Sequence, residues 1–358
     1  MDKKMEHKHG GNPHSDFYRF GLSRKPVLDL SVNLNPLGPP EIIRSHWPEL
    51  YNLIKDYPSV EGYGIVDYYQ TRFGIPRENI LAANGSTEMI YLVPRVLSIN
   101  NAAIFTPSFY DYQRASLACG ANVSTYPLSA ENDFAFPETH QIGEIVKKAD
   151  ALWIGRPNNP TGALISKRAV LDLADMFPDK YFLIDEAFIQ FVEGWGEKSL
   201  LFEAPRHNIL VIHSLTKFYA LAGLRMGAIV GDKDVIARLN EAKEPWTVNN
   251  LADKVAPLLI NCTVYEDQTF SLVAGERKRV YERLQEMDGV HPFPCTANFI
   301  LCRWKGTGGL DHVIRNLLEK GIYVRDCRNF TGLESDFFRF GLGTKEDNDR
   351  LLHLLEKL

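Results

Sequence analysis

The chain has 358 residues, of which 45% are hydrophobic and 24% are charged. These fractions are typical of globular proteins and exclude a disordered or fibrous chain. Because a single core rarely grows beyond about 250–300 residues, the length favours two domains. Forty Lys and Arg against 45 Asp and Glu give a net charge of −5, so no basic excess indicates binding to nucleic acid or to a membrane surface.

Cysteine usage and the N-terminus indicate a compartment. The five cysteines are odd in number and form no CxxC pair, which argues against a disulfide scaffold and for a reducing environment. The start, MDKKMEHKHGGNPHS, lacks the apolar core of a signal peptide. The apolar runs are far shorter than the ~20 residues that span a bilayer. We therefore expect a cytoplasmic protein with no membrane segment.

Short apolar runs alternate with amphipathic stretches through the middle of the chain. Nearly continuous apolar character predicts strands that are buried on both faces, at 102–106, 151–155, 181–185, 209–213 and 226–230. Helical periodicity lies between them, for example at 167–176 and 233–242. This alternation predicts an α/β domain with a mostly parallel sheet that is covered by helices.

The pattern changes after about residue 245. The rest of the chain predicts a smaller α+β domain: a long helical stretch that leads to 271–288, a strand in NFILCRW, a helix near 310–320, strands in GIYVR and FFRFG and a last helix at 346–357. We therefore expect three parts: an N-terminal segment over 1–40, a large domain over 41–245 and a small domain over 246–358.

Polar residues follow several predicted strands, where open α/β sheets bind ligands. Lys217 comes just after the strand at 209–213 and is a candidate Schiff-base nucleophile, although a surface lysine is the simpler interpretation of that residue alone. Asp185 ends another strand and would pair with a protonated ring nitrogen or cap a helix. The segment 84–88, NGSTE, precedes a helix and would bind an anion or form a capping box.

The order and spacing of these motifs are more specific than any one of them. Asn-Pro-Thr-Gly at 159–162, Asp-Glu-Ala at 185–187 and Ser-x-x-Lys at 214–217, with Arg225 eight residues on, resemble the aspartate-aminotransferase-like, fold-type-I family of pyridoxal-phosphate (PLP) enzymes. The resemblance covers about residues 9–357. It implies a large domain with a mostly parallel sheet of the seven-stranded type, a smaller α+β C-terminal domain and a homodimer.

The resemblance also implies roles for individual residues. Lys217 would bind the PLP aldehyde and carry protons, and Asp185 would pair with the ring nitrogen. The expected cofactor-binding residues are Gly85, Ser86, Thr87, Phe109, Asn159, Ser214, Arg225 and, from the partner subunit, Tyr57. Arg339, in FFRFGLG, would bind the substrate carboxylate through two hydrogen bonds. Phe188 departs from the pattern, since many relatives carry a tyrosine there that donates to the cofactor.

Within the family the chain resembles most the branch that contains histidinol-phosphate aminotransferases and threonine-phosphate decarboxylases. The HGGN start at 9–12, the SVNLNPLG segment at 31–38 and Phe188 in DEAF are similar to the decarboxylases. On composition alone, HGGN would be a polar tail, and His7, His9 and His14 would suggest metal binding. The resemblance instead implies that His9, Gly10 and Arg325 bind a substrate phosphate, and that Asn33 and Asn159 contact the substrate.

The implied reaction is decarboxylation of O-phospho-L-threonine to aminopropanol phosphate, or of O-phospho-L-serine to ethanolamine phosphate, for the cobalamin nucleotide loop. One methyl group in a pocket is worth only ~1–3 kcal/mol, so the sequence does not separate these two substrates. The first alternative is an aminotransferase that acts on histidinol phosphate. The second is a non-catalytic effector domain attached to a DNA-binding module. Two features argue against it: the segment before residue 29 is short for a helix-turn-helix, and the chain has no basic patch.

Overall fold

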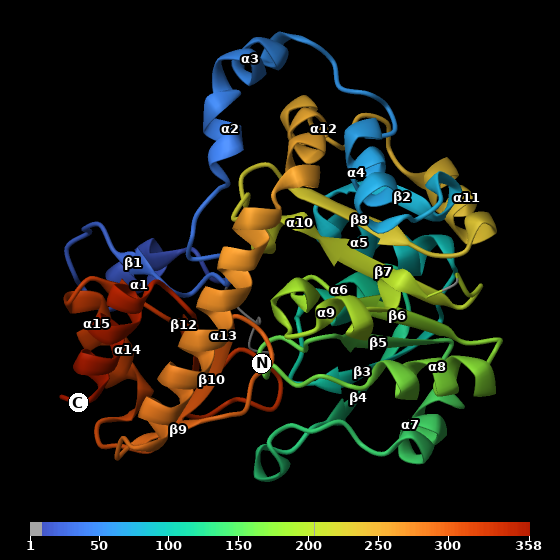
Figure 1. Cartoon of the computed structure of the whole chain (residues 1–358). Coiled ribbons are helices and arrows are strands. Elements are labelled where there is room, and N and C mark those ends of the chain that lie inside the picture. Colours follow the sequence, from blue (N-terminus) through green and yellow to red (C-terminus); the bar gives the residue numbers. More distant parts are fainter. Residues whose placement is uncertain (1–8, 204) are drawn as a thin grey trace.

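The computed structural model describes residues 9–203 and 205–358, and it is built around two sheets with helices packed on them (Figure 1). Residues 1–8 of the predicted N-terminal segment, including His7, lie outside the described residues. The exact domain boundaries at 40 and 245 remain predictions.

The larger sheet has seven strands in the order β2-β8-β7-β6-β5-β3-β4. All neighbours run parallel except β8, which is antiparallel to both β2 and β7. The strands are β2 (Ile80–Asn84), β3 (Asn101–Thr106), β4 (Asn122–Pro127), β5 (Ala151–Gly155), β6 (Tyr181–Asp185), β7 (Ile209–Ser214) and β8 (Met226–Val230). The predicted mostly parallel sheet is therefore confirmed.

All five predicted strands belong to this sheet, and their apolar character follows from helices on both faces. In β6, Phe182 and Ile184 pack into one apolar cluster, whereas Leu183 packs into the cluster on the other face. Both edge strands, β2 and β4, were not predicted. Most of β4 is exposed, so its sequence, NVSTYP, lacks the buried apolar run that marks the central strands.

Helices cover both faces of the sheet. α5 (Ser86–Val96), α6 (Asp111–Ala118) and α11 (Lys233–Ala242) lie on one face, and α4 (Tyr63–Phe73) and α8 (Lys167–Met176) on the other. The other elements of this part are α2 (Glu41–Ser45), α3 (Trp47–Asn52), η1 (Leu53–Lys55), η2 (Arg77–Asn79), η3 (Ala130–Asn132), α7 (Thr139–Val146), η4 (Ile189–Phe191), α9 (Trp195–Lys198), η5 (Leu200–Phe202), α10 (Leu215–Phe218), α12 (Asn250–Val255) and η6 (Ala256–Asn261).

The C-terminal part forms the predicted α+β unit around a four-stranded antiparallel sheet, in the order β12-β13-β10-β9. Its strands are β9 (Val290–Pro292), β10 (Phe299–Trp304), β12 (Arg325–Asp326) and β13 (Phe337–Gly341), and its helices are α13 (Thr263–Gln285), α14 (Gly309–Glu319) and α15 (Lys345–Leu355). The long helical stretch that was predicted to lead to 271–288 consists of α12, η6 and α13, and the first turns of α13 link the two parts of the molecule.

The N-terminal segment packs against the C-terminal part. Strand β1 (Leu28–Asp29) pairs in parallel with β11 (Ile322–Tyr323). Phe17 of α1 (Pro13–Arg19) is buried against Leu318 and Tyr323. Figure 1 shows this segment in dark blue beside the red C-terminal helices. Residues from both ends of the chain therefore meet at one side of the central sheet.

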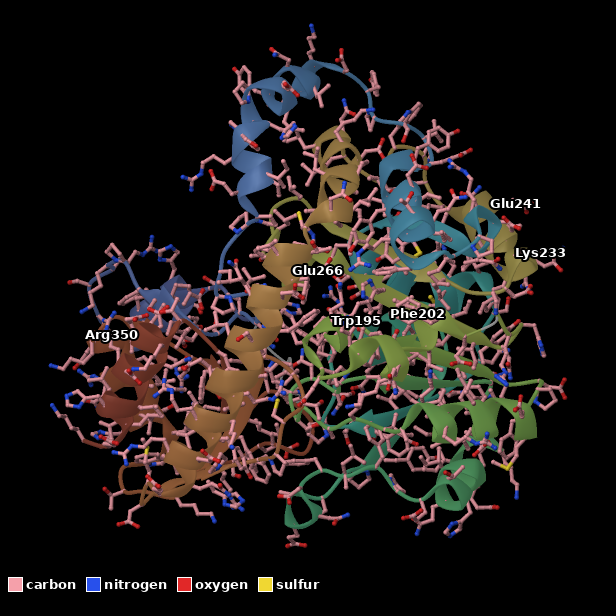
Figure 2. The ribbon with its side chains drawn as sticks, in the orientation of Figure 1. Trp195, Phe202, Lys233, Glu241, Glu266 and Arg350 are labelled. Atoms are coloured by element: carbon pink, nitrogen blue, oxygen red, sulfur yellow. The ribbon has the colours of Figure 1, made fainter. Side chains whose placement is uncertain are left out.

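Helix α13 connects the two parts through a buried polar network. Glu266, labelled in Figure 2, accepts a hydrogen bond from Tyr219 Oη at 2.7 Å. It also forms an ion pair with Arg72, whose Nη2 lies 2.6 Å from Glu266 Oε2. Tyr219 follows Lys217 by two residues, so this network fixes the start of α13 beside α10. Among the helices of the described residues, none combines the length and apolar character of a membrane span.

Candidate active site

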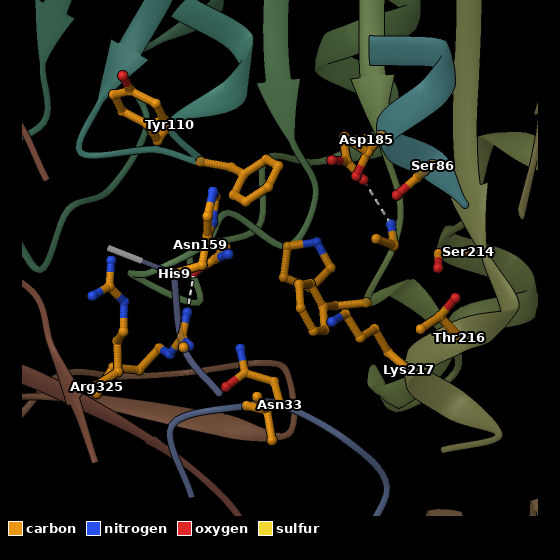
Figure 3. Close-up of a pocket in the computed structure, with 18 of the residues that line it drawn as sticks. His9, Asn33, Ser86, Tyr110, Asn159, Asp185, Ser214, Thr216, Lys217 and Arg325 are labelled. Carbon is orange, nitrogen blue, oxygen red and sulfur yellow. Dashed lines mark hydrogen bonds between the residues drawn. The ribbon is translucent and has the colours of Figure 1, made fainter. Parts of the chain in front are cut away.

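One pocket lies where the carboxyl ends of the central strands face the C-terminal sheet. Figure 3 shows residues of both parts, and of the N-terminal segment, directed into it. The lining residues are His9, Gly10, Ser31, Val32, Asn33, Ser86, Thr87, Phe109, Tyr110, Tyr112, Pro157, Asn159, Asp185, Ala187, Phe188, Ser214, Thr216, Lys217, Arg225, Arg325, Phe330 and Arg339. The structure thus brings together every predicted site residue except Gly85 and Tyr57.

Gly85 lies behind the pocket wall, at the start of α5. Its φ of +72° favours glycine, and a Cβ there would lie 2.5 Å from Arg225 Nη2, so the guanidinium would have to move out of its present position. No side chain caps α5, so its first turn, with Ser86 and Thr87, presents a helix N-terminus to the pocket. Glu88 Oε2 instead accepts from Asn84 N, at 2.6 Å. The arrangement forms an anion cradle with Arg225 as its cation.

Lys217 projects into the pocket from α10, directly after β7. The pKa of its amine is lowered to about 8, chiefly by burial and then by the positive charges of Arg225 and Arg339, whereas the charge of Asp185 opposes this shift. A lysine with such a pKa carries a useful fraction of neutral, nucleophilic amine near neutral pH. The α10 turn is held by Thr216, whose Oγ1 donates to Met226 O at 3.2 Å. The surface interpretation of Lys217 is wrong.

Asp185 ends β6 inside the pocket and is 7% exposed. Tyr112 Oη donates to its Oδ2 at 2.8 Å, and the Ala187 N–H donates to its Oδ1 at 2.9 Å. Burial raises the pKa of Asp185, and these two hydrogen bonds oppose that rise. A buried carboxylate with two donors already in place is suited to hold a cationic N–H group. The bond to Ala187 closes a turn after β6, and the next helix, η4, begins at Ile189, so the alternative that Asp185 caps a helix is wrong.

A buried ion pair supports the base of the site and was not predicted. Arg156 Nη1 lies 2.6 Å from Glu186 Oε1, and the two side chains are 1% and 0% exposed. Arg156 Nε also donates to Ile165 O at 3.0 Å. The pair ties the 156–162 loop to the end of β6, so it fixes Asn159 relative to Asp185. Both partners lie in motifs that the sequence analysis singled out, RPNNPTG at 156–162 and DEA at 185–187, but the sequence does not show that they contact each other.

Arg339 lies on β13 and is buried at the opposite side of the pocket. Its Nη2 donates to Ser31 O at 2.8 Å, and its Nη1 donates to Asn159 Oδ1. Burial lowers the pKa of Arg339 to about 10. Its Nε and Asn33 Oδ1 are buried without a hydrogen-bond partner among the described residues. Buried groups of this kind are normally satisfied, so a polar ligand is the expected partner.

Arg325 and His9 define the far end of the pocket. Arg325 Nη2 donates to Asn329 Oδ1 at 2.8 Å, and its guanidinium lies over the Phe330 ring. The His9 ring lies 6.2 Å from the Phe109 ring, centroid to centroid, at an angle of 51°. Figure 3 shows His9 and Arg325 on the same side of the site as Asn33. His9 and Gly10 therefore reach the pocket from the N-terminal segment, as predicted.

The donor set fits PLP. The anion cradle suits a phosphate, Lys217 suits an aldehyde, Asp185 suits a protonated ring nitrogen, and Phe109 offers an aromatic face. With Asn159 Oδ1 bonded to Arg339, the Asn159 amide nitrogen is the group that would donate to a phenolic oxygen. Phe188 offers no such donor, since it is an apolar wall that packs edge-on against Phe299 at 5.2 Å.

Two predicted features lie elsewhere. Tyr57 is 85% exposed and forms no part of the pocket in this chain; its ring contacts Trp246, with 5.7 Å between centroids. His7 lies outside the described residues, and among residues 9–203 and 205–358 no group of three His, Cys, Asp or Glu could hold a metal ion. The site residues that sequence analysis missed are chiefly Ser31, Tyr112 and Phe330, which resemble ordinary loop and core residues.

The family of the chain follows from comparison with known proteins. The model of "Aminotransferase class I and II" matches residues 25–355. The chain belongs to this family. Threonine-phosphate decarboxylase of Salmonella typhimurium is 31% identical, over 98% of this chain and 96% of that protein. The adenosylcobalamin biosynthesis bifunctional protein CobDQ of Leptospira interrogans is also 31% identical, over 96% of this chain but 40% of that longer protein.

Solved structures of this aminotransferase family have the same fold. L-threonine-O-3-phosphate decarboxylase from Porphyromonas gingivalis is 26% identical, with a TM-score of 0.82 over 92% of this chain and 98% of that one. Histidinol-phosphate aminotransferase from Clostridium acetobutylicum is 28% identical, with a TM-score of 0.85 over the same shares. The predicted fold class is confirmed, and both kinds of enzyme in the branch that the sequence resembles are among the relatives of this chain.

Proposed function

We propose that this aminotransferase-family chain is a PLP-dependent decarboxylase of an O-phospho amino acid, with O-phospho-L-threonine as the first candidate substrate. The observation that carries the proposal is the pairing of Arg325 with Arg339. The two residues are directly opposite each other on β12 and β13, and they are 6% and 5% exposed. Both arginines line the pocket. One substrate with both a phosphate and a carboxylate would bind one arginine at each of its ends.

PLP, when bound, supplies an aldehyde and an electron sink for the electron pair of a breaking bond at the substrate Cα. We assign its phosphate to Ser86, Thr87, Ser214, Arg225 and the backbone of Gly85. Asp185 would keep the ring nitrogen protonated, and Asn159 would donate to the phenolic oxygen. Lys217 would bind the aldehyde through its neutral amine and later return to it.

The protein residues would choose which bond at Cα breaks. Arg325, with His9 and Gly10, would hold the phosphate, and Arg339, with Asn33, would hold the carboxylate. Two fixed ends leave the substrate little freedom to rotate about Cα, so they set which bond lies perpendicular to the cofactor ring. In decarboxylation the bond from Cα to the carboxylate carbon breaks, carbon dioxide leaves, and Lys217 delivers one proton to Cα.

The name of the Leptospira relative supports a place in cobalamin biosynthesis. The product of O-phosphothreonine would be aminopropanol phosphate, for the cobalamin nucleotide loop. O-phosphoserine would give ethanolamine phosphate by the same steps. The likeness to histidinol-phosphate aminotransferase supports the second candidate function. Histidinol phosphate has no carboxylate, so it would leave Arg339 without its partner in that half-reaction.

The test is a side-by-side product assay of the purified enzyme with PLP. O-phosphothreonine, O-phosphoserine and histidinol phosphate plus 2-oxoglutarate are the three substrates. We expect carbon dioxide from O-phosphothreonine without any oxo acid. Turnover of histidinol phosphate alone would refute the decarboxylase and establish the aminotransferase. Faster release from O-phosphoserine would change the substrate and leave the reaction unchanged.

We also propose that the active form is a homodimer in the cytoplasm. The segment between α2 and α4 exposes many large apolar side chains, among them Trp47, Tyr51, Ile54, Tyr57 and Val60. Figure 1 shows α2 and α3 projecting from the body of the molecule. An exposed apolar patch of this kind is typical of an interaction surface. A second copy is the proposed occupant, since Tyr57 would reach a cofactor phosphate only across the interface.

A further inference from the structure

Residues 9–12, His9-Gly10-Gly11-Asn12, form a strap that lies across the edge of the pocket. Side chains of later segments hold the strap: the Gly11 N–H donates to Ser31 Oγ at 2.7 Å, and Tyr323 Oη donates to Asn12 O at 3.4 Å. The shorter of these bonds joins the strap to Ser31, which lines the pocket. Ser31 is fully buried, so water does not compete for its hydroxyl.

Asp29 fixes the direction of this hydroxyl. Ser31 Oγ donates its single proton to Asp29 Oδ1 at 2.6 Å, and the Ser31 N–H donates to the same oxygen at 2.9 Å. A serine hydroxyl has one proton and two lone pairs. With the proton directed at a carboxylate, a lone pair is left to accept from Gly11. Asp29 therefore makes Ser31 a permanent acceptor for the strap.

The carbonyl of Ser31 connects the strap to Arg339. Arg339 Nη2 donates to Ser31 O at 2.8 Å, in a buried bond. Gly10 packs against that same oxygen, so closely that a Cβ on Gly10 would overlap it. Glycine at position 10 is thus required by contact rather than by its φ angle. Gly10 of the strap and Arg339 therefore contact the same carbonyl oxygen.

We propose that Ser31 is a positioning residue that couples closure of the strap to the orientation of Arg339. The inference rests on the proposed function, in which His9 of the strap contacts the substrate phosphate and Arg339 contacts the carboxylate. Ser31 lines the pocket but is assigned to neither binding end. It joins the two binding ends, so that a phosphate that closes the strap also fixes the carboxylate grip. A substrate that lacks the phosphate gains nothing from this connection.

The first test measures the strap without any turnover. Hydrogen–deuterium exchange with fragmentation that resolves the Gly11 amide is compared for the PLP-loaded wild type, Ser31→Ala and Ser31→Thr. We expect exchange at Gly11 to be at least tenfold faster in Ser31→Ala and restored in Ser31→Thr, which keeps a hydroxyl. The matched control is Ser166→Ala, since Ser166 Oγ also accepts from a backbone N–H, that of Ala169, but at the start of α8 and outside the pocket lining. Unchanged exchange in Ser31→Ala would show that Ser31 does not hold the strap.

The second test measures the coupling to Arg339. With O-phosphothreonine, Ser31→Ala should lower kcat/KM about tenfold, as expected for loss of one hydrogen bond near a charged group. Gly10→Ala should lower it at least as much, because its methyl group displaces the Ser31 carbonyl. Faster Gly11 exchange with unchanged kcat/KM in Ser31→Ala would refute the coupling. If the wild type did not turn over O-phosphothreonine, the proposed function would fail. The Gly11 exchange rates would still decide whether Ser31 holds the strap.

Discussion

Tyr112 Oη donates a 2.8 Å hydrogen bond to Asp185 Oδ2 in the interior of the site, and the Tyr112 ring stacks on Trp153 at 5.0 Å between centroids. The stacked indole fixes the ring, so the hydroxyl cannot turn to another acceptor. Burial raises the pKa of Tyr112 well above its usual value, which keeps this hydroxyl a donor at every physiological pH. Burial favours the neutral form of Asp185, and this hydrogen bond favours the ionised form instead.

Tyr112→Phe should therefore weaken cofactor binding. Without the donor, the pKa of Asp185 rises further, and less of the carboxylate is ionised to pair with a ring nitrogen. We expect the dissociation constant for PLP to rise about tenfold, in line with loss of a hydrogen bond to a charged group. Spectroscopic titration of the apoenzyme with PLP measures it. Tyr91→Phe is the control, because Tyr91 donates to Asp111 outside the pocket lining; an equal effect in both variants would contradict the role of Tyr112.

Arg325→Ala tests the phosphate end of the pocket. Removing one buried, charged partner of a dianion should cost about 2–3 kcal/mol, so kcat/KM for O-phosphothreonine should fall roughly 30- to 150-fold. Arg328→Ala is the matched control, since Arg328 lies three residues after Arg325 and pairs with Asp326 and Asp311. If kcat/KM fell as much in Arg328→Ala as in Arg325→Ala, Arg325 would act through the stability of the fold instead of through contact with the substrate.

A mixed dimer tests whether Tyr57 acts across the interface. Neither Lys217→Ala nor Tyr57→Ala should turn over substrate well as a homodimer. In the heterodimer of the two, one site combines Lys217 of one chain with Tyr57 of the other, so co-expression should restore activity. Assay of the purified, differently tagged heterodimer gives the answer. Failure to restore activity, or a fully active monomer in analytical ultracentrifugation, would contradict the proposed dimer.

His213 should make the protein acid-sensitive. It is fully buried beside Tyr69, whose Oη lies 2.7 Å from His213 Nδ1, and burial lowers its pKa to about 3 from an ordinary value of 6.5. The unfolded chain therefore binds a proton that the folded chain rejects, and stability is lost as the pH falls from about 6.5 towards 3. At pH 5 this loss is about 2 kcal/mol for this one group.

Urea unfolding at pH 7 and pH 5 measures this loss for the wild type and His213→Gln. The wild type should lose about 2 kcal/mol more than the variant between these two pH values. Tyr69→Phe retains the imidazole and should keep the steep loss. An identical pH dependence in the wild type and His213→Gln would exclude His213 as its source.

The sequence predicted most of the fold because buried parallel strands have a distinct composition. It also predicted that residues from strand ends, and His9 from the N-terminus, meet in one pocket. It did not predict contacts that depend on side-chain direction. Tyr112 lies within a helix and resembles a core residue, and the bond from Arg339 to the Ser31 carbonyl involves a backbone group that any residue would supply. The exposed edge strand β4 lacked the apolar run on which strand prediction depends.

The central claim is that the bond to the carboxylate breaks and that Lys217 protonates Cα. Turnover of O-phosphothreonine in deuterium oxide, followed by mass spectrometry of the amine, tests it most directly. The account predicts aminopropanol phosphate with one solvent deuterium on carbon, one equivalent of carbon dioxide and the original Cα hydrogen retained. An oxo acid product, or an amine that has lost its original Cα hydrogen, would show that the C–H bond breaks and would contradict the account.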